Sequence, residues 1–385
     1  MAEDWQAAGF GIYVHWPFCQ SKCPYCDFNS HVAASIDQRA WAKAYMSELT
    51  RYRDMFPERV VNSVFFGGGT PSLMDPRIIE TITTCIAESW TFARDVEITL
   101  EANPSSVEAG RFAAYRDAGV SRVSLGIQSL EDTDLKRLGR LHSASEGLRA
   151  IEIAQGAFPR VSFDLIYARQ DQSLDQWQAE LTRALALGTE HLSLYQLTIE
   201  DGTAFGRLHS VGKLPGLPGD DLSADMYAAT QAICGSHGLP AYEVSNHAAE
   251  FAQSRHNLIY WRGGDYIGIG PGAHGRLTLG GTRFATETAL DPATWLDAAA
   301  KGNGESRRQV IEPRERAFEY LMMALRLAEG VDIPRLLDMD NALLNNDKVA
   351  DLIAGGYLRQ SNRALGATDA GRMVLNAIIR DITNG

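Results

Sequence analysis

Cysteine is scarce in this sequence and is unevenly placed. The 385 residues contain five cysteines, an odd number, and three of the five fall within eight positions. Disulfide frameworks belong mainly to short secreted chains with paired cysteines, so this pattern argues against one here. The three crowded cysteines instead indicate the ligation of a metal or a cluster.

Positive charge and long apolar runs are also lacking. Lys and Arg number 36 against 48 Asp and Glu, which gives a formal net charge of −12. Nucleic-acid binding depends on clustered basic residues, so nucleic acid is not an expected partner. No stretch of 18 or more apolar residues occurs, so no transmembrane helix is predicted. Residues Met1–Phe10 include Glu3 and Asp4 and lack the layout of a secretory signal, so we expect a cytoplasmic protein.

Short β-rich runs alternate with amphipathic stretches over the first two hundred residues, which is typical of a parallel sheet wound with helices. The predicted strands are Gly11–His15, Val60–Phe66, Glu97–Glu101, Arg122–Ile127, Val161–Tyr167 and His191–Thr198. The predicted helices between them are Asp37–Arg53, Pro76–Glu88, Val107–Ala118, Ser143–Gln155 and Ser173–Leu187. Six such units suit an α/β fold with an incomplete (β/α)6 barrel, and the same periodicity is compatible with a doubly wound open sheet.

The length of the chain allows two or three domains. Glycine and proline are frequent between Asp201 and Pro218, which marks a boundary. We predict a partial β/α barrel in residues 1–205, an extension of that barrel in 206–305 and a helical, winged-helix-like domain in 306–385. No chemistry is expected in the last of these.

The three crowded cysteines, Cys19, Cys23 and Cys26, have the spacing C-x3-C-x2-C directly after the first predicted strand. Three thiolates can hold three irons of a [4Fe–4S] cluster and leave the fourth iron open to another ligand. Cys85 and Cys234 lie in apolar helical stretches and are predicted to be structural.

A zinc site is the alternative interpretation of the same cysteines. Its fourth ligand would be His15, Asp27 or His31, because sites with three cysteines and one histidine are common. Zinc ligands usually come as two separated pairs, and no second pair follows at a typical distance. The spacing therefore favours the cluster.

Several motifs together resemble one protein family. The cysteine spacing followed by Gly68-Gly69-Thr70-Pro71 resembles the radical S-adenosylmethionine superfamily. The segments Tyr13–Cys19 (YVHWPFC), Glu101–Pro104 (EANP) and Asp164–Tyr167 (DLIY) are similar to the oxygen-independent coproporphyrinogen III oxidase family. The resemblance implies a radical S-adenosylmethionine barrel in which the open iron of a [4Fe–4S] cluster binds S-adenosylmethionine.

The resemblance also implies which residues contact S-adenosylmethionine. Gly68, Gly69 and Thr70 match a turn where missing side chains let backbone carbonyls approach the methionyl ammonium; a tight turn is the alternative. The other matching positions are Tyr13, Tyr25, Glu101, Gln128, Arg140 and Asp164. Carboxylates accept hydrogen bonds from ribose hydroxyls or an ammonium, and Arg140 offers a fork of donors to a carboxylate. The alternatives are packing for the tyrosines and solvated surface for the polar groups.

Two further features separate the branches of this family. The oxidases have another cysteine two residues beyond the third ligand, whereas this chain has Phe28, so we expect no coproporphyrinogen III oxidase activity. The hexapeptide His256–Trp261 (HNLIYW) resembles the H-N-x-x-Y-W signature of the HemW-type haem chaperones. The resemblance implies that His256 ligates haem iron while Tyr260 and Trp261 offer flat apolar surface. A packed turn is the alternative for this hexapeptide, and His247 and His274 are rival ligands.

The resemblance therefore implies a haem chaperone that delivers haem to acceptor proteins of the respiratory chain at the inner face of the membrane. Flavodoxin or ferredoxin is the expected reductant. Two alternatives remain: a coproporphyrinogen III oxidase or other radical enzyme acting on a tetrapyrrole, and a zinc-stabilised structural module. One departure from the family is Ala168-Arg169-Gln170, where many members have Gly-Leu-Pro. It predicts a changed loop after the fifth strand, with Asp164 unaffected.

Overall fold

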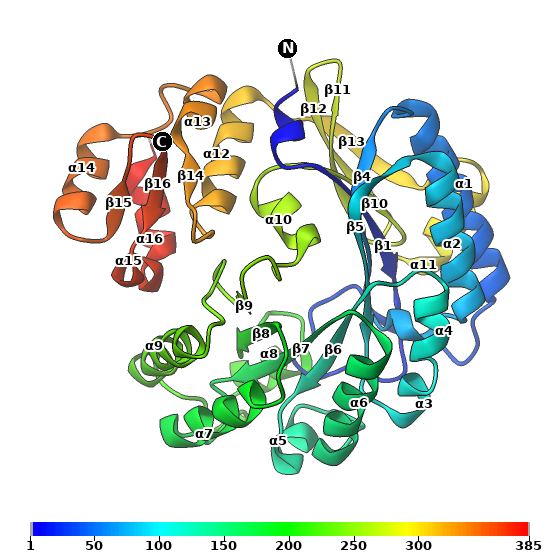
Figure 1. The fold of residues 1–385 in the computed structure, drawn as a ribbon, viewed down its shortest axis with the longest axis horizontal. Coiled ribbons are helices and arrows are strands. Elements are labelled where there is room, and N and C mark those ends of the chain that lie inside the picture. Colours follow the sequence, from blue (N-terminus) through cyan, green and yellow to red (C-terminus); the bar gives the residue numbers. More distant parts are fainter. Residues whose placement is uncertain (1–2, 384–385) are drawn as a thin grey trace.

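The computed structural model describes residues 3–383, and its largest element is a sheet of eleven strands (Figure 1). Six parallel strands cross its middle in chain order: β1 (Phe10–Trp16), β4 (Val60–Gly68), β5 (Thr91–Ala102), β6 (Arg122–Gln128), β7 (Arg160–Tyr167) and β8 (His191–Gln196). These are the six predicted strands. A doubly wound sheet carries helices on both faces, whereas these six strands run in chain order and their connecting helices lie on the outer face (Figure 1). The sheet is therefore an incomplete, open β/α barrel, and the doubly wound alternative is wrong.

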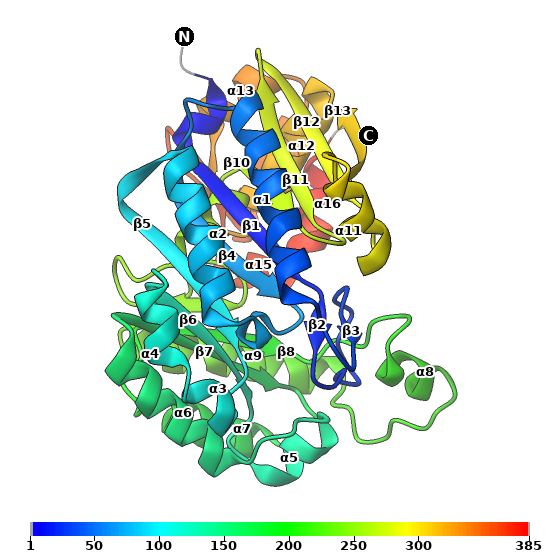
Figure 2. The same ribbon diagram turned by 90° about the vertical axis from the view of Figure 1, so that its right-hand side faces the viewer.

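Helices cover the outer face of this barrel (Figures 1 and 2). They are α1 (Gln38–Met55), α2 (Pro76–Ser89), α3 (Ser106–Ala109), α4 (Phe112–Asp117), α5 (Asp132–Arg137), α6 (Ala144–Ala157) and α7 (Leu174–Leu185). Ser143 with Glu146 and Ser173 with Gln176 form capping boxes that fix where α6 and α7 begin. The single helix predicted over Val107–Ala118 is instead two short helices, because the chain turns at Gly110, a poor helix former.

The strands have an apolar outer face and a polar inner face. Successive strand residues point to opposite sides, so Val123 and Leu125 of β6 belong to the hydrophobic core while Ser124 and Gln128 line the barrel interior. On β5, Leu100 is fully buried in the core and its neighbour Glu101 lies at the interior cavity. The barrel interior thus presents hydrogen-bonding groups rather than a packed apolar core.

The middle of the chain extends the sheet at both edges. At one edge β9 (Asn246–Ala248) pairs antiparallel with β8. At the other, β10 (Asp265–Ile269) pairs parallel with β1 and is followed by three antiparallel strands, β11 (His274–Leu279), β12 (Thr282–Thr288) and β13 (Glu305–Val310). The helices of this part are α8 (Ala204–Ser210), α9 (Asp220–Ser236), α10 (Arg255–Trp261) and α11 (Pro292–Ala300).

The C-terminal part has a hydrophobic core of its own and lies to one side of the barrel (Figure 1). Its helices are α12 (Pro313–Ala324), α13 (Ile333–Met339), α14 (Asn346–Ala354), α15 (Asp369–Met373) and α16 (Leu375–Ile382). A small antiparallel sheet is formed by β14 (Val331–Asp332), β16 (Ala364–Ala367) and β15 (Leu358–Gln360). Among residues 3–383, no helix has the length and apolar character needed to cross a membrane.

Candidate functional site

The three cysteines lie together on the loop that follows β1. Cys19 ends the short strand β2 (Phe18–Cys19), which pairs with β3 (His31–Val32), and the Cys26 amide donates to the Cys23 carbonyl at 3.2 Å. Figure 2 shows β2 and β3 beyond the end of β1 at one end of the barrel. This is the end where the parallel strands finish, which is the usual position of active sites in β/α barrels.

Two polar side chains donate hydrogen bonds to these sulfur atoms. The Thr70 hydroxyl lies 3.5 Å from Cys19 Sγ, and Arg140 Nη1 lies 3.4 Å from Cys23 Sγ. Burial raises the pKa of Cys19 and of Cys26, and the Thr70 hydrogen bond opposes this effect at Cys19. Because metals bind the thiolate form, iron ligation would supply the positive charge that three clustered thiolates need.

The donor set fits a three-cysteine [4Fe–4S] cluster better than a zinc ion. In a cubane each thiolate binds a different iron, so the sulfur atoms need not converge on one point. Within residues 3–383, no three His, Cys, Asp or Glu side chains gather where they could hold one metal ion. The candidate zinc ligands His15 and His31 instead place Nε2 2.9 Å from the Asn29 carbonyl and 3.1 Å from Asn29 Oδ1.

A cavity of about 150 Å³ adjoins the cysteines and collects almost all residues predicted to bind S-adenosylmethionine. It is lined by Cys19, Cys23, Cys26, Tyr25, Gly68, Gly69, Thr70, Glu101, Gln128, Arg140 and Asp164, together with Phe28, Asn103 and Ser124. These residues come from six parts of the chain and meet because the carboxyl ends of parallel strands share one edge of the sheet. Their roles as cofactor ligands stay predictions.

The glycine-rich turn at the end of β4 requires glycine for steric reasons. Gly68 has a φ of +108°, and a Cβ there would collide with the His15 ring. A Cβ on Gly69 would lie 2.6 Å from the Phe18 carbonyl oxygen. The Gly68 amide donates to Glu101 Oε2 at 3.2 Å. The turn therefore brings the backbone of β4 against the cysteine loop, which opens one wall of the cavity to a ligand.

Two half-buried carboxyl groups, those of Glu101 and Asp164, line the cavity. Burial raises the pKa of Glu101 to about 8, and repulsion from Asp164 adds to this effect. Burial also raises the pKa of Asp164 to about 6, and hydrogen bonds from Ser193 and Ser124 oppose it. Both acids resist ionisation, and a cationic ligand in the cavity would favour their charged forms and bind to them more tightly.

Asn103 connects the wall of the cavity to the cysteine loop and had no role assigned from the sequence. Its Oδ1 accepts from Arg140 Nη2 at 2.6 Å, and its Nδ2 donates to Thr70 Oγ1 at 3.1 Å. Arg140 Nη2 also donates to the Gly126 carbonyl at 2.8 Å. The signal that could have identified Asn103 was its place in the EANP motif, beside Glu101. Arg140 and Thr70, the two donors to cysteine sulfur, are thus held in one network.

The two tyrosines with predicted cofactor contacts differ in position. Tyr25 lines the cavity, whereas Tyr13 does not. The Tyr13 hydroxyl lies 3.0 Å from His15 Nδ1, and its ring stacks on His256 with centroids 6.1 Å apart. Tyr13 therefore lies between the cysteine loop and α10, and its contact with S-adenosylmethionine remains a prediction.

His256 is packed inside the molecule with both ring nitrogens engaged. Nδ1 lies 2.8 Å from Ser63 Oγ, Nε2 lies 2.6 Å from the Tyr260 hydroxyl, and the ring stacks on Phe65. Burial lowers the pKa of His256 to about 3, so the ring is neutral. In this conformation an iron ion could reach either nitrogen only after one of these hydrogen bonds breaks. Trp261 is half-buried at the end of α10.

The rival histidines have contrasting surroundings. His247 on β9 is 1% exposed, and neither ring nitrogen makes a hydrogen bond of ordinary geometry. The Leu239 carbonyl raises the pKa of His247, but burial outweighs it and lowers the value to about 4. His274, at the start of β11, is exposed. Which histidine binds haem remains a prediction.

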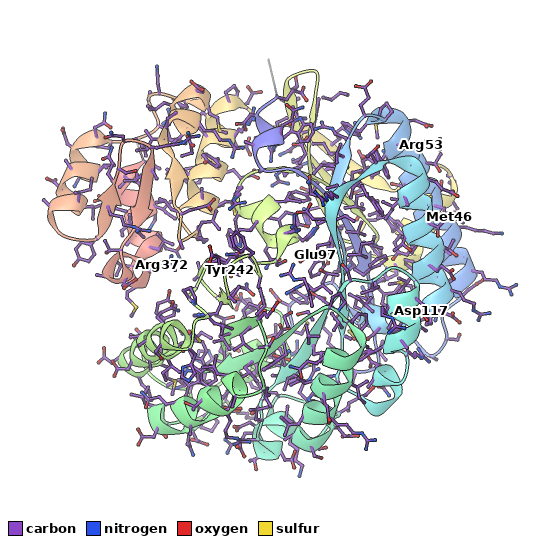
Figure 3. All side chains as sticks on the ribbon, in the orientation of Figure 1. Met46, Arg53, Glu97, Asp117, Tyr242 and Arg372 are labelled. Atoms are coloured by element: carbon purple, nitrogen blue, oxygen red, sulfur yellow. The ribbon has the colours of Figure 1, made fainter. Side chains whose placement is uncertain are left out.

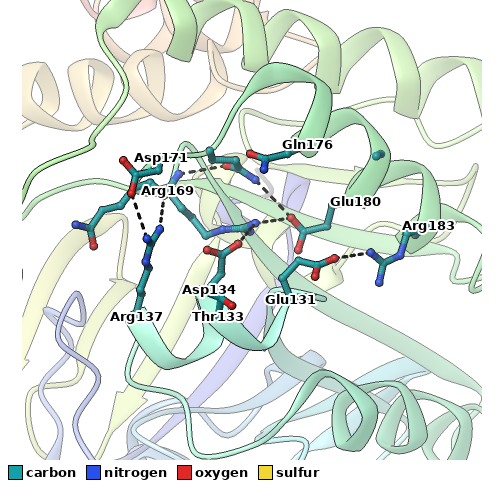
Figure 4. A pocket seen from close by; sticks show the side chains of 12 residues that line it. Glu131, Thr133, Asp134, Arg137, Arg169, Asp171, Gln176, Glu180 and Arg183 are labelled. Carbon is teal, nitrogen blue, oxygen red and sulfur yellow. Dashed lines mark hydrogen bonds and ion pairs between the residues drawn. The ribbon is translucent and has the colours of Figure 1, made fainter.

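A second pocket lies outside the barrel, where the loop after β7 meets α5 and α7 (Figure 4). Arg169 from this loop is buried and forms ion pairs with Asp134 of α5 and Glu180 of α7. Ala168 and Asp171 on either side have positive φ values of 57° and 59°. The segment Ala168-Arg169-Gln170, which replaces Gly-Leu-Pro, thus contributes Arg169 to a buried ion-pair network. Asp164 still lines the cysteine cavity.

An open parallel β/α barrel with a three-cysteine loop at the carboxyl ends of its strands defines a radical S-adenosylmethionine protein. Residues 13–182 match the model of the Radical SAM superfamily, and residues 311–374 match that of the HemN C-terminal domain. The chain is 37% identical over 375 residues to the heme chaperone HemW of Escherichia coli (strain K12), covering 96% of each chain. The chain belongs to the HemW family.

Two other comparisons agree with this assignment. The chain is 38% identical over 380 residues to radical S-adenosyl methionine domain-containing protein 1, mitochondrial, of Bos taurus, covering 96% of this chain and 86% of that protein. Coproporphyrinogen III oxidase (HemN) from Escherichia coli has the same fold, with a TM-score of 0.80 and 20% sequence identity. The match covers 98% of this chain and 92% of that protein. The predicted radical S-adenosylmethionine family is confirmed.

Proposed function

We propose that this protein is a haem chaperone that binds a [4Fe–4S] cluster and S-adenosylmethionine and transfers haem to acceptor proteins. The observation that carries the cofactor part is the convergence of Cys19, Cys23 and Cys26 with Glu101 and Arg140 on one cavity. The haem part rests on relatives named heme chaperone HemW, which are 33–37% identical over 96–97% of this chain.

The side chains of the cavity have distinct proposed tasks. The three cysteines hold the cluster, which can supply an electron to the sulfonium of S-adenosylmethionine when both are bound. Arg140 is placed to pair with the carboxylate of the methionyl group, because its guanidinium already donates toward the cysteine loop. Glu101 and Asp164 are placed to accept hydrogen bonds from the ammonium or the ribose hydroxyls.

A measurement of S-adenosylmethionine binding tests these tasks. Charge-assisted contacts contribute about 1.5–3 kcal/mol each, so Arg140→Ala and Asp164→Ala should each weaken binding roughly ten- to a hundred-fold. Titration calorimetry on anaerobically reconstituted protein measures this. The exposed Arg207→Ala serves as the matched control and should bind normally. Unchanged affinity in both cavity variants would contradict the assignment.

The same titration should depend on pH through Glu101. Its pKa of about 8 means that the carboxyl group is mostly neutral at pH 6 and gains charge as the pH rises. Because the ionised form attracts the cationic ligand, wild-type affinity should increase between pH 6 and 7.5. The increase should be smaller in Glu101→Gln, which cannot ionise.

A second candidate function is coproporphyrinogen III oxidation, which the shared fold with HemN favours. Phe28 argues against it, because this cavity-lining side chain stands where the oxidases have a further cysteine, and it is 57% exposed. We expect no anaerobic turnover of coproporphyrinogen III, together with retention of haem and its transfer to an apoprotein. Turnover of coproporphyrinogen III without haem retention would show that the protein is an oxidase and not a chaperone.

Haem ligation is tested by His256→Ala, with His247→Ala as the matched comparison. An axial imidazole gives a recognisable Soret band, so replacement of the true ligand should shift that band and weaken haem retention. We predict the effect for His256→Ala. A shifted Soret band and weaker haem retention in His247→Ala alone would show that His247, which is buried without a hydrogen bond of ordinary geometry, ligates the iron instead.

The proposed setting of this function is the cytoplasm, at the inner face of the membrane. The acceptors would be haem proteins of the respiratory chain, and a flavodoxin or ferredoxin would reduce the cluster. The acidic net charge of −12 agrees with a partner surface other than nucleic acid.

A further inference from the structure

A large cleft separates α9 from the C-terminal part of the chain. It has a volume of about 840 Å³ and is lined by one face of α9, the segment after it and the region from β16 to α15. Cavities that bind small molecules span about 300–1,000 Å³, so the cleft is large enough for an organic cofactor. It is distinct from the cysteine cavity, with which it shares no lining residue.

The walls of the cleft combine small apolar side chains with positive charge. Six of its lining residues are alanines: Ala228, Ala232, Ala241, Ala328, Ala367 and Ala370. Such side chains leave flat surfaces that a planar ring can approach closely. Two arginines, Arg359 of β15 and Arg372 of α15, also line the cleft, with Asp369 as its single acidic residue.

Two polar atoms in the cleft wall are buried and make no hydrogen bond of ordinary geometry. They are the Tyr227 hydroxyl and Gln231 Nε2, both on α9. Burial raises the pKa of Tyr227, and the neighbouring Arg372 guanidinium opposes this effect. Most buried polar groups in proteins are hydrogen-bonded, so unpaired groups at a cleft are typical of a surface that binds a polar ligand.

The cleft is connected to the hexapeptide on α10 through Tyr242. The Ala328 amide, in the cleft wall, donates to the Tyr242 carbonyl at 2.9 Å. The Tyr242 hydroxyl lies 3.4 Å from Asn257 Nδ2, next to His256. Figure 3 shows Arg372 and Tyr242 where the C-terminal part faces the middle of the chain. His247 on β9 pairs with Ala241, which lines the cleft, so this histidine lies beside the cleft wall.

We propose that this cleft is the haem site and that Arg359 and Arg372 hold the two propionates. The ligand class is a planar, apolar ring with two carboxylates, which matches the alanine walls and the two guanidinium groups; Arg359 Nη2 already donates to the Ala328 carbonyl at 2.5 Å, and its other nitrogens are available to a carboxylate. This inference rests on the proposed haem binding. No histidine is among the lining residues, so the inference concerns the ring and the propionates. Of the candidate iron ligands, His247 lies beside the cleft because it pairs with Ala241 of the cleft wall, whereas His256 packs against Ser63 and Tyr260.

The test measures binding of haem and of haem dimethyl ester, which has the same ring without carboxylates. Arg359→Ala/Arg372→Ala should weaken haem binding roughly ten- to a hundred-fold and leave the binding of the ester unchanged, because the ester has no charge to lose. Arg380→Ala, at an exposed arginine of α16 outside the cleft, is the matched control and should bind both ligands normally.

A second variant fills the space for the porphyrin ring and leaves the two arginines in place. Ala232 is exposed on α9, so Ala232→Trp should fold and should weaken haem and the ester alike, whereas Asp225→Trp on the same helix outside the cleft should not. Wild-type haem affinity in both the arginine variant and Ala232→Trp would overturn the cleft site while haem binding itself stands. A wild-type protein that binds neither haem nor metal-free protoporphyrin IX would overturn the site and the proposed function together.

Discussion

Replacing any one of Cys19, Cys23 and Cys26 by alanine is expected to abolish the brown absorption of the anaerobically reconstituted protein. Each thiolate holds a different iron, so the loss of one leaves two irons without a protein ligand. No neighbouring cysteine can substitute, because the other two cysteines, Cys85 and Cys234, lie in helices outside the cavity. Iron and sulfide analysis with visible spectroscopy measures the effect.

Cys85→Ala and Cys234→Ala are the matched controls for this prediction. Cys234 is buried in the hydrophobic core and Cys85 packs against it, so both variants should keep a full cluster. The wild-type cluster should also degrade in air, because one iron faces an open cavity. A full complement of iron after the loss of Cys19, Cys23 or Cys26 would contradict the assignment, and stoichiometric zinc without sulfide would favour the structural module.

Arg169→Met is expected to lower the free energy of unfolding by about 3–5 kcal/mol, because it leaves a buried carboxylate without its ionic partner. Glu180 is 3% exposed and pairs with Arg169, and its Oε1 accepts hydrogen bonds at 2.7 Å from Ser129 Oγ and from the Leu130 amide. Those two donors remain in the variant, but neither carries a charge. Urea denaturation of the full chain measures the change.

The control for this variant is Arg183→Met in the same pocket (Figure 4). Arg183 pairs with Glu131, and both side chains are about half exposed, so its removal should cost less than about 1 kcal/mol. Equal losses of unfolding free energy in Arg169→Met and Arg183→Met would show that burial of the Arg169–Glu180 pair does not increase the cost of breaking it. Arg169→Met combined with Glu180→Leu should recover part of the loss, since no unpaired charge remains.

The fold could be predicted from the sequence to a large extent because its signals are local. Alternating β-rich and amphipathic segments identified the parallel strands β1 and β4 to β8 and the helices that begin after Ser143 and Ser173, but not the parallel strand β10. The break at Gly110 was missed because the apolar pattern continues on both sides of it. The choice between a barrel and a doubly wound sheet depended on how the strands and helices are arranged in space. The periodicity of apolar residues in the sequence carries no information on that arrangement.

The cofactor residues were predicted one motif at a time. The sequence could name Glu101, Arg140 and Asp164 because each stands in a recognisable segment after or within a strand. Asn103 stands in the EANP motif but was assigned no role, because its importance comes from contacts with Thr70 and Arg140, which lie 33 and 37 residues away in the sequence. The sequence also placed Tyr13 in the cofactor site; the structure stacks this ring on His256, and its contact with S-adenosylmethionine stays a prediction.

The sequence by itself determined the three-cysteine loop, the parallel β/α class and the family, because cluster spacing and strand periodicity are properties of neighbouring residues. Only the tertiary structure decided the rest. It engaged both ring nitrogens of His256 in hydrogen bonds, buried His247 without a hydrogen bond of ordinary geometry, built the Arg169 network and formed the cleft beside α9. These features arise where segments far apart in the chain meet, and that meeting depends on the order in which strands pair and on how the C-terminal part packs against the barrel.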